Sequence, residues 1–449
     1  MASAAEQMAA NMSWGAFSKA TDLQKRILFA LALLIVYRVG TFIPIPGIDV
    51  DQLDRFIEQT QSGIIGIFNM FAGGAVGRMA IFALGIMPYI SASIIVQLMT
   101  AMVPELEKLK KEGEAGRKKI NQYTRYGTVL LATLQAYGIA VGLEGQNLVL
   151  DPGLFFRASA VITLVGGTMF LMWLGEQITA RGIGNGISLI IFVGIIAELP
   201  GALFQFFDLG RRGDLSEIAV IGVLVLAAVV IYGVVYVERA QRRIPINYPR
   251  QQVAGGRMRE GQSQFLPLKL NPAGVIPAIF ASSLLLLPTT IAGFSYGDDS
   301  GFLGTVVAAL GRGQPLQLLL FAALIVFFAF FYTATVSFKP EEVAENLKKN
   351  GGHVPGIRPG PRTAEYLDNV ATRLVTVGSI YLVLVCLLPE MLISELAVPF
   401  YFGGTSLLIV VSVTMDTITQ VQSHLLAHQY HGLIEKSKIR GKKRSPARS

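Results

Sequence analysis

Charge, cysteine and histidine are all scarce in this sequence. Only 15% of its 449 residues are charged, whereas 52% are apolar. Several apolar runs continue for about 20 residues without a charge, which excludes a soluble protein and indicates a polytopic helical membrane protein. The single cysteine, Cys386, excludes a disulfide within the chain.

Motifs for catalysis and cofactor binding are incomplete. Gly256–Ser263 has the spacing of a phosphate-binding loop, but Gln262 occupies the lysine position and no strand is predicted before it. His424, His428 and His431 share one helical face, yet no cysteine accompanies them, which favours a solvated helix end over a metal site. All four histidines lie in segments predicted to be cytoplasmic, so an intramembrane Ser–His pair is excluded. We predict no catalytic residue, no cofactor and no metal.

Ten apolar stretches are long enough to be spans, and together they predict an all-α fold. They cover roughly residues 27–43, 79–103, 126–143, 158–174, 186–206, 218–237, 274–294, 316–338, 374–388 and 400–418. With a cytoplasmic N-terminus, 31 of the 38 Lys and Arg residues fall in cytoplasmic segments. This bias predicts that both termini are cytoplasmic. Five spans on each side of the midpoint permit two related halves with a pathway between them.

The stretch Gly63–Val103 has the pattern of a path that can be blocked. Its first apolar piece, Ile64–Phe71, is too short to cross a bilayer, and the Gly73–Gly74 pair then permits an abrupt turn. The following span contains Pro88, which we expect to kink it near its middle. A re-entrant half-helix before a kinked, partly polar span predicts a water-accessible path and a segment that closes it.

Isoleucines flank this proline at helical spacing. Ile86 and Ile90 share one face of the second span, and Ile187 and Ile191 share one face of the fifth. An aliphatic constriction can close a pore by dewetting, although ordinary helix packing gives the same spacing. Asp416 lies toward the inner end of the last span, where an interfacial residue is favoured over a gate residue.

Two cytoplasmic segments, residues 238–272 and 339–373, are long and basic. Arg242, Arg243 and Arg358 lie in them. Such charge either sets topology beside anionic lipid or forms a docking surface for an acidic or RNA-bearing partner, because arginine binds phosphate and carboxylate groups in a planar fork.

Seven blocks of sequence carry a resemblance to a known family. They are FNMFAGGA with IFALGIMPYISASIIVQLM, GEQITARGIGNGISLIIF, ERAQRRIPINY, NPAGVIPAIFASS, FKPEEVAENLKKNGGHVPGIRPG and VPFYFGGTSLLIVVSV. In this order, between about Lys25 and Gln422, the chain resembles the SecY family, whose members are the central subunits of bacterial protein-conducting channels. The leader and the last residues of the chain fall outside the resemblance.

The resemblance implies two five-helix halves around an hourglass pore, at residues 27–206 and 207–424, hinged near Gly201–Glu217. A cytoplasmic leader at 1–26 and a basic tail at 425–449 flank them. The implied pore ring is Ile86, Ile90, Ile191, Ile279 and Ile409. The implied plug, at about 63–74, includes Ile64, Ile65, Phe68, Asn69, Met70, Phe71, Gly73 and Gly74. The implied lateral gate between the second and seventh spans carries Ser91, Ser93, Gln97, Ser282 and Ser283, and Arg242, Arg243 and Arg358 would dock partners.

The family's function implies a channel without enzymatic activity in the inner (plasma) membrane. It would pass unfolded preproteins across the membrane and release hydrophobic segments, such as signal sequences, into lipid. Expected partners are the small membrane subunits SecE and SecG, the motor ATPase SecA and the ribosome, with energy from ATP, translation or the proton-motive force. The alternatives are a secondary transporter for a small solute, which needs a polar site at mid-membrane, and a structural scaffold.

Overall fold

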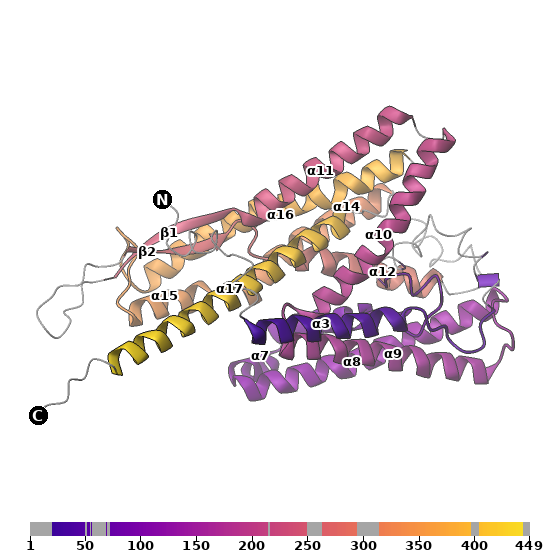
Figure 1. Cartoon of the computed structure of the whole chain (residues 1–449), viewed down its shortest axis with the longest axis horizontal. Coiled ribbons are helices and arrows are strands. Elements are labelled where there is room, and N and C mark those ends of the chain that lie inside the picture. The colour runs from indigo at the N-terminus through magenta and orange to yellow at the C-terminus, as the bar shows by residue number, and fades with distance from the viewer. Residues whose placement is uncertain are drawn as a thin grey trace, which may run out of the picture.

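The computed structural model describes residues 20–49, 52, 53, 55, 69, 72–213, 216–248, 263–293, 314–396 and 404–442. Long helices dominate it, and one two-stranded antiparallel sheet accompanies them (Figure 1). In chain order the elements are α3 (Thr21–Gly40), α6 (Met87–Met102), α7 (Pro104–Lys111), α8 (Glu114–Gly145), α9 (Leu154–Arg181), α10 (Gly186–Arg212), α11 (Glu217–Arg239), β1 (Gln241–Asn247), β2 (Ser263–Lys269), α12 (Ile276–Gly293), α14 (Pro315–Tyr332), the π-helical turn η1 (Thr333–Ser337), α15 (Pro340–Lys349), α16 (Pro361–Leu396) and α17 (Gly404–Lys442).

A helix occurs at each of the ten predicted spans, so the expected all-α polytopic membrane fold is confirmed. Within the described part of the chain, seven helices are long and apolar enough to cross a membrane, and the pair α6–α7, bent by 98°, is an eighth candidate. The helix α3 carries Lys25, Arg26 and Arg38 within its 20 residues. The apolar part of α12 that can be assessed, Ile276–Leu285, is shorter than a span.

The helices pack in two groups. α3, α6, α8, α9 and α10 pack together in the first, and α12, α14, α16 and α17 in the second. Figure 1 shows α3, α8 and α9 along one side of the molecule and α11, α14 and α16 along the other, with α10 crossing between them. The two groups meet where α6 contacts α12 and where α10 contacts α17. The largest buried apolar cluster takes side chains from both groups at these junctions.

The second span begins later than predicted. Residues 79–86 form hydrogen-bonded turns, not helix, with positive φ at Met79 (41°) and Gly85 (56°). This segment pairs with the chain after α3, since Ile45 N–H donates to the carbonyl of Met79 at 2.9 Å. Pro88 therefore lies in the first turn of α6, where its missing N–H leaves no intrahelical bond unmade. The expectation that Pro88 kinks the middle of a span was wrong.

The region between the fifth and sixth spans is also more helical than expected. α10 continues to Arg212, through Pro200, and α11 begins at Glu217. A left-handed Gly213 (φ 86°) ends α10, as is common for the residue after a helix C-terminus. The predicted hinge at Gly201–Glu217 is therefore helical through most of its length.

The segment between α11 and α12 contains a β-hairpin, not the loop predicted from the sequence. Residues of β1 alternate between exposed and buried, and the buried pair, Ile244 and Ile246, faces inward. The hairpin packs against α16 through a small apolar cluster that includes Ile244, Leu268, Leu367 and Val370. In Figure 1 it lies at the same end of the molecule as α15 and the end of α17.

Candidate functional site

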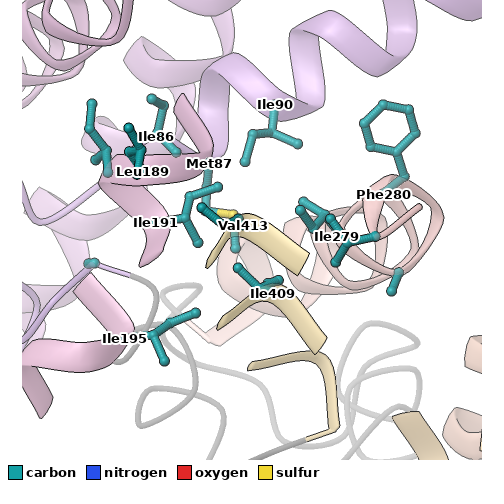
Figure 2. Close-up of a cluster of buried hydrophobic side chains, with 14 of the residues drawn as sticks. Ile86, Met87, Ile90, Leu189, Ile191, Ile195, Ile279, Phe280, Ile409 and Val413 are labelled. Carbon is teal, nitrogen blue, oxygen red and sulfur yellow. The ribbon is translucent and has the colours of Figure 1, made fainter. Parts of the chain in front are cut away.

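Five isoleucines from four helices meet in one buried cluster. Ile86 is the N-cap residue of α6 and Ile90 lies in its first turn. Ile191 comes from α10, Ile279 from α12 and Ile409 from α17. Each is at most 8% exposed. Figure 2 shows their side chains converging on a common region from opposite sides of the molecule. These residues are the five that the sequence predicted for a pore ring.

The five isoleucines and the neighbours labelled beside them in Figure 2 offer only hydrocarbon and one thioether. Met87, Leu189, Ile195 and Val413 are also buried in the cluster, which the sequence analysis missed (Figure 2). Helical spacing could have found two of them, because Ile195 and Val413 each follow a predicted ring residue by four positions. Such a lining can exclude water and ions without selecting a particular polar ligand.

The interface between α6 and α12 carries few polar interactions. The Ser283 hydroxyl donates to the Met87 thioether at 3.6 Å and so links the two helices. By contrast, Gln97 donates to Ser93 on its own helix at 3.1 Å, and Ser282 donates to the carbonyl of Ile279 at 2.9 Å. Ser91 is buried, and the Gln97 side-chain carbonyl is buried with no hydrogen-bond partner among the described residues. Weak or local bonds of this kind leave the interface separable.

A second link joins the two groups of helices beyond the C-terminal end of α6. Lys110 of α7 donates to the carbonyl of Thr335 in η1 at 3.2 Å. Partial burial, with a smaller contribution from nearby Lys339, lowers the pKa of Lys110. The carbonyl is available at the η1 turn, where the regular α-helical bonding pattern is interrupted.

Only part of the predicted plug lies within the described residues. Ile64, Ile65, Phe68, Met70 and Phe71 fall outside them, whereas Asn69, Gly73 and Gly74 fall inside. The Asn69 side-chain oxygen accepts a hydrogen bond from the Gly77 N–H at 2.7 Å, and its carbonyl accepts one from the Gly74 N–H at 2.9 Å. Asn69 thus ties the two sides of the glycine turn together.

The two basic segments form one platform. Asn247 of β1 and His353 exchange backbone hydrogen bonds of 2.9 and 3.0 Å, which joins the hairpin to the loop before α16. Arg242, Arg243 and Arg358 are all exposed on this platform. Asp416, which was considered as a gate residue, is 69% exposed and faces Lys269 of β2 at 3.7 Å, so it is an interfacial residue. Among the described residues, no group of three His, Cys, Asp or Glu side chains could hold a metal.

Comparison with known proteins gives consistent matches across the chain. Residues 80–418 match the model of the SecY family. The chain is 55% identical over 422 residues to the protein translocase subunit SecY of Pseudomonas aeruginosa, and the match covers 94% of this chain and 95% of that protein. Among solved structures, one described as a protein conducting channel aligns with a TM-score of 0.62 at 18% identity, over 90% of this chain and 92% of that one. Sec61 in the canine ribosome–channel complex from the endoplasmic reticulum aligns with a TM-score of 0.59 at 18% identity, over the same shares of the two chains.

Proposed function

This chain belongs to the SecY family, and we propose that it forms the channel through which unfolded preproteins cross the membrane and from which hydrophobic segments pass sideways into lipid. The observation that carries the proposal is the buried meeting of Ile86, Ile90, Ile191, Ile279 and Ile409 at the junction of the two groups of helices. We propose two halves, at residues 27–206 and 207–424, and the packing of the helices in two groups supports this division.

The composition of the ring suits a changing cargo. A translocating polypeptide presents every kind of side chain in turn, so a lining with fixed polar partners would hold some of them too tightly. Aliphatic side chains close around the chain by van der Waals contact and shed water when the pore is empty. A solute transporter instead needs a defined polar site, whereas the five ring isoleucines and the neighbours labelled in Figure 2 are apolar.

The contact between α6 and α12 is the proposed lateral gate. Its cross-helix bond from Ser283 to Met87 is weak, so modest binding energy from a hydrophobic segment can separate the helices. Ser91, Ser93, Gln97 and Ser282 supply limited polarity beside it. The segment at about 63–74 is the proposed plug that closes the outer side of the ring.

The proposed energy source lies outside this chain. Its sequence lacks a complete phosphate-binding loop, so we assign ATP hydrolysis to the motor SecA, with translation at the ribosome and the proton-motive force as further sources. Arg242, Arg243 and Arg358 are exposed on the joined cytoplasmic platform, which suits docking of SecA or ribosomal RNA. SecE and SecG are the proposed small membrane partners.

The chain is a multi-pass membrane protein, and we place it in the inner membrane with both termini cytoplasmic. The start of α3 and the end of α17 lie at the same end of the molecule as α7, α15 and the hairpin (Figure 1). This end holds most of the basic residues, which is the distribution expected of a cytoplasmic face.

Reconstituted vesicles test this function directly. The chain with SecE and SecG, supplied with SecA and ATP, should make a radiolabelled preprotein resistant to external protease, whereas vesicles without this chain should not. Preprotein that stays accessible to protease although SecA and ATP are active would contradict the proposal. Saturable uptake of one small solute in the same vesicles would instead support the transporter alternative.

A further inference from the structure

The glycine turn at the end of the proposed plug is wedged between α3 and α10. Gly73 and Gly74 have φ values of 66° and 80°, which other residues rarely adopt. A Cβ atom on Gly73 would lie 2.7 Å from the Tyr37 hydroxyl and 3.0 Å from the Cα of Gly194. A Cβ atom on Gly74 would overlap the carboxylate of Glu198. The turn therefore fits only because both residues lack a side chain.

Arg38 at the end of α3 holds this turn directly. Its Nη1 donates to the carbonyl of Gly73 at 2.6 Å, and its Nη2 lies 4.0 Å from Oε1 of Glu198 on α10. The guanidinium also lies over the ring of Phe42, 5.0 Å from its centre. One side chain thus connects the turn, α3 and α10, and both members of the ion pair are only 28% exposed.

A second arginine lies on the other side of the turn. Arg78 packs against the same Phe42 ring, with its Cζ 4.2 Å from the ring centre. Its Nη1 is buried without a hydrogen-bond partner among the described residues, and it lies 3.1 Å from the position that a Gly74 Cβ would take. Gly74 is therefore flanked by the carboxylate of Glu198 and by an arginine nitrogen for which the described residues supply no acceptor. Glu198 is the only anion that we find in this group of three charges.

These contacts lie close to the proposed ring. Glu198 follows Ile191 by two helical turns on α10, about 10 Å along the helix axis, and the glycine turn leads through residues 79–86 to Ile86. Movement of the turn would therefore be transmitted to the ring from two sides.

We propose that Arg38 and Glu198 form a latch that holds the Gly73–Gly74 turn against α3 and α10 in the resting channel. The inference rests on the proposed function, and it assigns a role to two charged residues to which the sequence motifs assign none. A translocating chain opens the channel by displacing the turn, which breaks the Arg38–Gly73 hydrogen bond and separates Glu198 from Arg38. Arg38 and Glu198 are positioning residues: they act through the turn and need not touch the cargo.

Ion conductance in planar bilayers tests the latch, with the chain in complex with its small subunits. Glu198→Gln keeps the shape of the side chain and removes its charge. Arg38→Gln removes the guanidinium group that donates to the Gly73 carbonyl. Arg38→Gln should raise the resting leak by about tenfold, the factor that corresponds to the loss of about one charge-assisted hydrogen bond. Glu198→Gln removes an ion pair at 4.0 Å and should raise the leak less, by about two- to fivefold. Arg38→Lys should leak less than Arg38→Gln, because it retains the charge and one possible donor.

The matched control is Glu144→Gln, which removes an acid from another interhelical ion pair. Glu144 bonds to Arg157 and to the Gly153 N–H and does not contact the glycine turn. It should leave the resting leak at the wild-type level. Thermal melting of each variant shows whether it is folded, and preprotein translocation is measured with the same preparations.

The possible outcomes separate the latch from the function on which it rests. A rise in leak for Arg38→Gln and Glu198→Gln, but not for Glu144→Gln, supports the latch. Folded, translocating Arg38→Gln and Glu198→Gln channels that remain as tight as wild type would overturn it. Failure of the wild-type complex to translocate would count against the proposed function, whatever the leak of the variants.

Discussion

The hydroxyl of Ser283 on α12 points at the sulfur of Met87 on α6, 3.6 Å away, and forms a hydrogen bond between the two groups of helices. Both side chains are buried. A hydroxyl–thioether bond is among the weaker hydrogen bonds, so this contact fixes the register of the interface without making it hard to open. The remaining contact between α6 and α12 is mainly apolar, and a hydrophobic segment can replace such a surface with its own.

A covalent crosslink between positions 87 and 283 should block transport through the channel. A Met87→Cys/Ser283→Cys variant, bridged by a short bifunctional thiol reagent, should lose both translocation and lateral release, because the two halves can no longer separate at the gate. Protease protection of a preprotein measures the first activity, and extraction of a hydrophobic segment with lipid measures the second. The single-cysteine variants are the controls, and both retain the buried Cys386. Full activity of the bridged variant would place the gate elsewhere.

Polar substitutions in the ring should make the resting channel leak. Ile191 is 3% exposed and Ile409 is fully buried, so the Ile191→Ser/Ile409→Ser pair introduces water-binding groups and empty volume at the constriction. We expect an increase of at least about tenfold in bilayer ion conductance if closure of the ring depends on dewetting. Ile196→Ser is the matched control, since Ile196 lies on the same helix but is 39% exposed. Equal conductance in the ring variant and this control would contradict the assignment of Ile191 and Ile409 to the pore constriction.

Removing the Lys110 link should ease lateral release. Lys110→Met deletes the donor to the Thr335 carbonyl while keeping an apolar stem of similar length. Because the bond is exposed to solvent, its loss should raise the rate of release of a marginally hydrophobic segment by only about two- to fivefold, equivalent to about 0.5–1 kcal/mol. Lys108→Met makes the same charge change on the same helix and should have no effect. A release rate unchanged in Lys110→Met would show that this link does not restrain the gate.

Charge reversal on the platform formed by the two basic segments should weaken partner binding in a salt-dependent way. Arg242→Glu and Arg358→Glu each replace an exposed cation on the surface formed by β1 and the His353 loop. Binding to ribosomes and to SecA, measured at several salt concentrations, should fall most at low ionic strength, where electrostatic attraction contributes most. Lys348→Glu, on nearby α15, controls for net charge. If neither substitution changed binding to ribosomes or to SecA, the two arginines would not dock these partners and would only help to set the orientation of the chain in the membrane.

Sequence reasoning located the spans because their signal is local. An uncharged apolar run of about 20 residues must be buried in lipid or protein whatever surrounds it, so helices lie at all ten expected places. The helix starts were harder to predict, because the composition of residues 79–86 is as apolar as that of α6. Their turns depend on backbone pairing with the chain after α3, which periodicity does not reveal.

The candidate functional site also has one part that the sequence predicted and another part that it did not. Family motifs identified the five isoleucines, and the structure brings them into one cluster. The β-hairpin was missed because Pro245 and Pro267 interrupt both strand patterns and because its pairing spans a long connection. No sequence pattern distinguishes Arg38 and Glu198, since nothing in the sequence shows that α3 and α10 approach the same glycine turn.

The central claim is that a polypeptide passes through the isoleucine ring, and a site-specific crosslink tests it most directly. A photoreactive residue replaces Ile279, which is buried in the ring, or Leu284, which lies on the same helix and is 42% exposed. Each variant is reconstituted with its partners and given a stalled, radiolabelled preprotein. We predict an adduct at position 279 that requires SecA and ATP and a much weaker one at position 284. Translocation without an adduct at position 279 would contradict the claim, because the chain would then cross by another path.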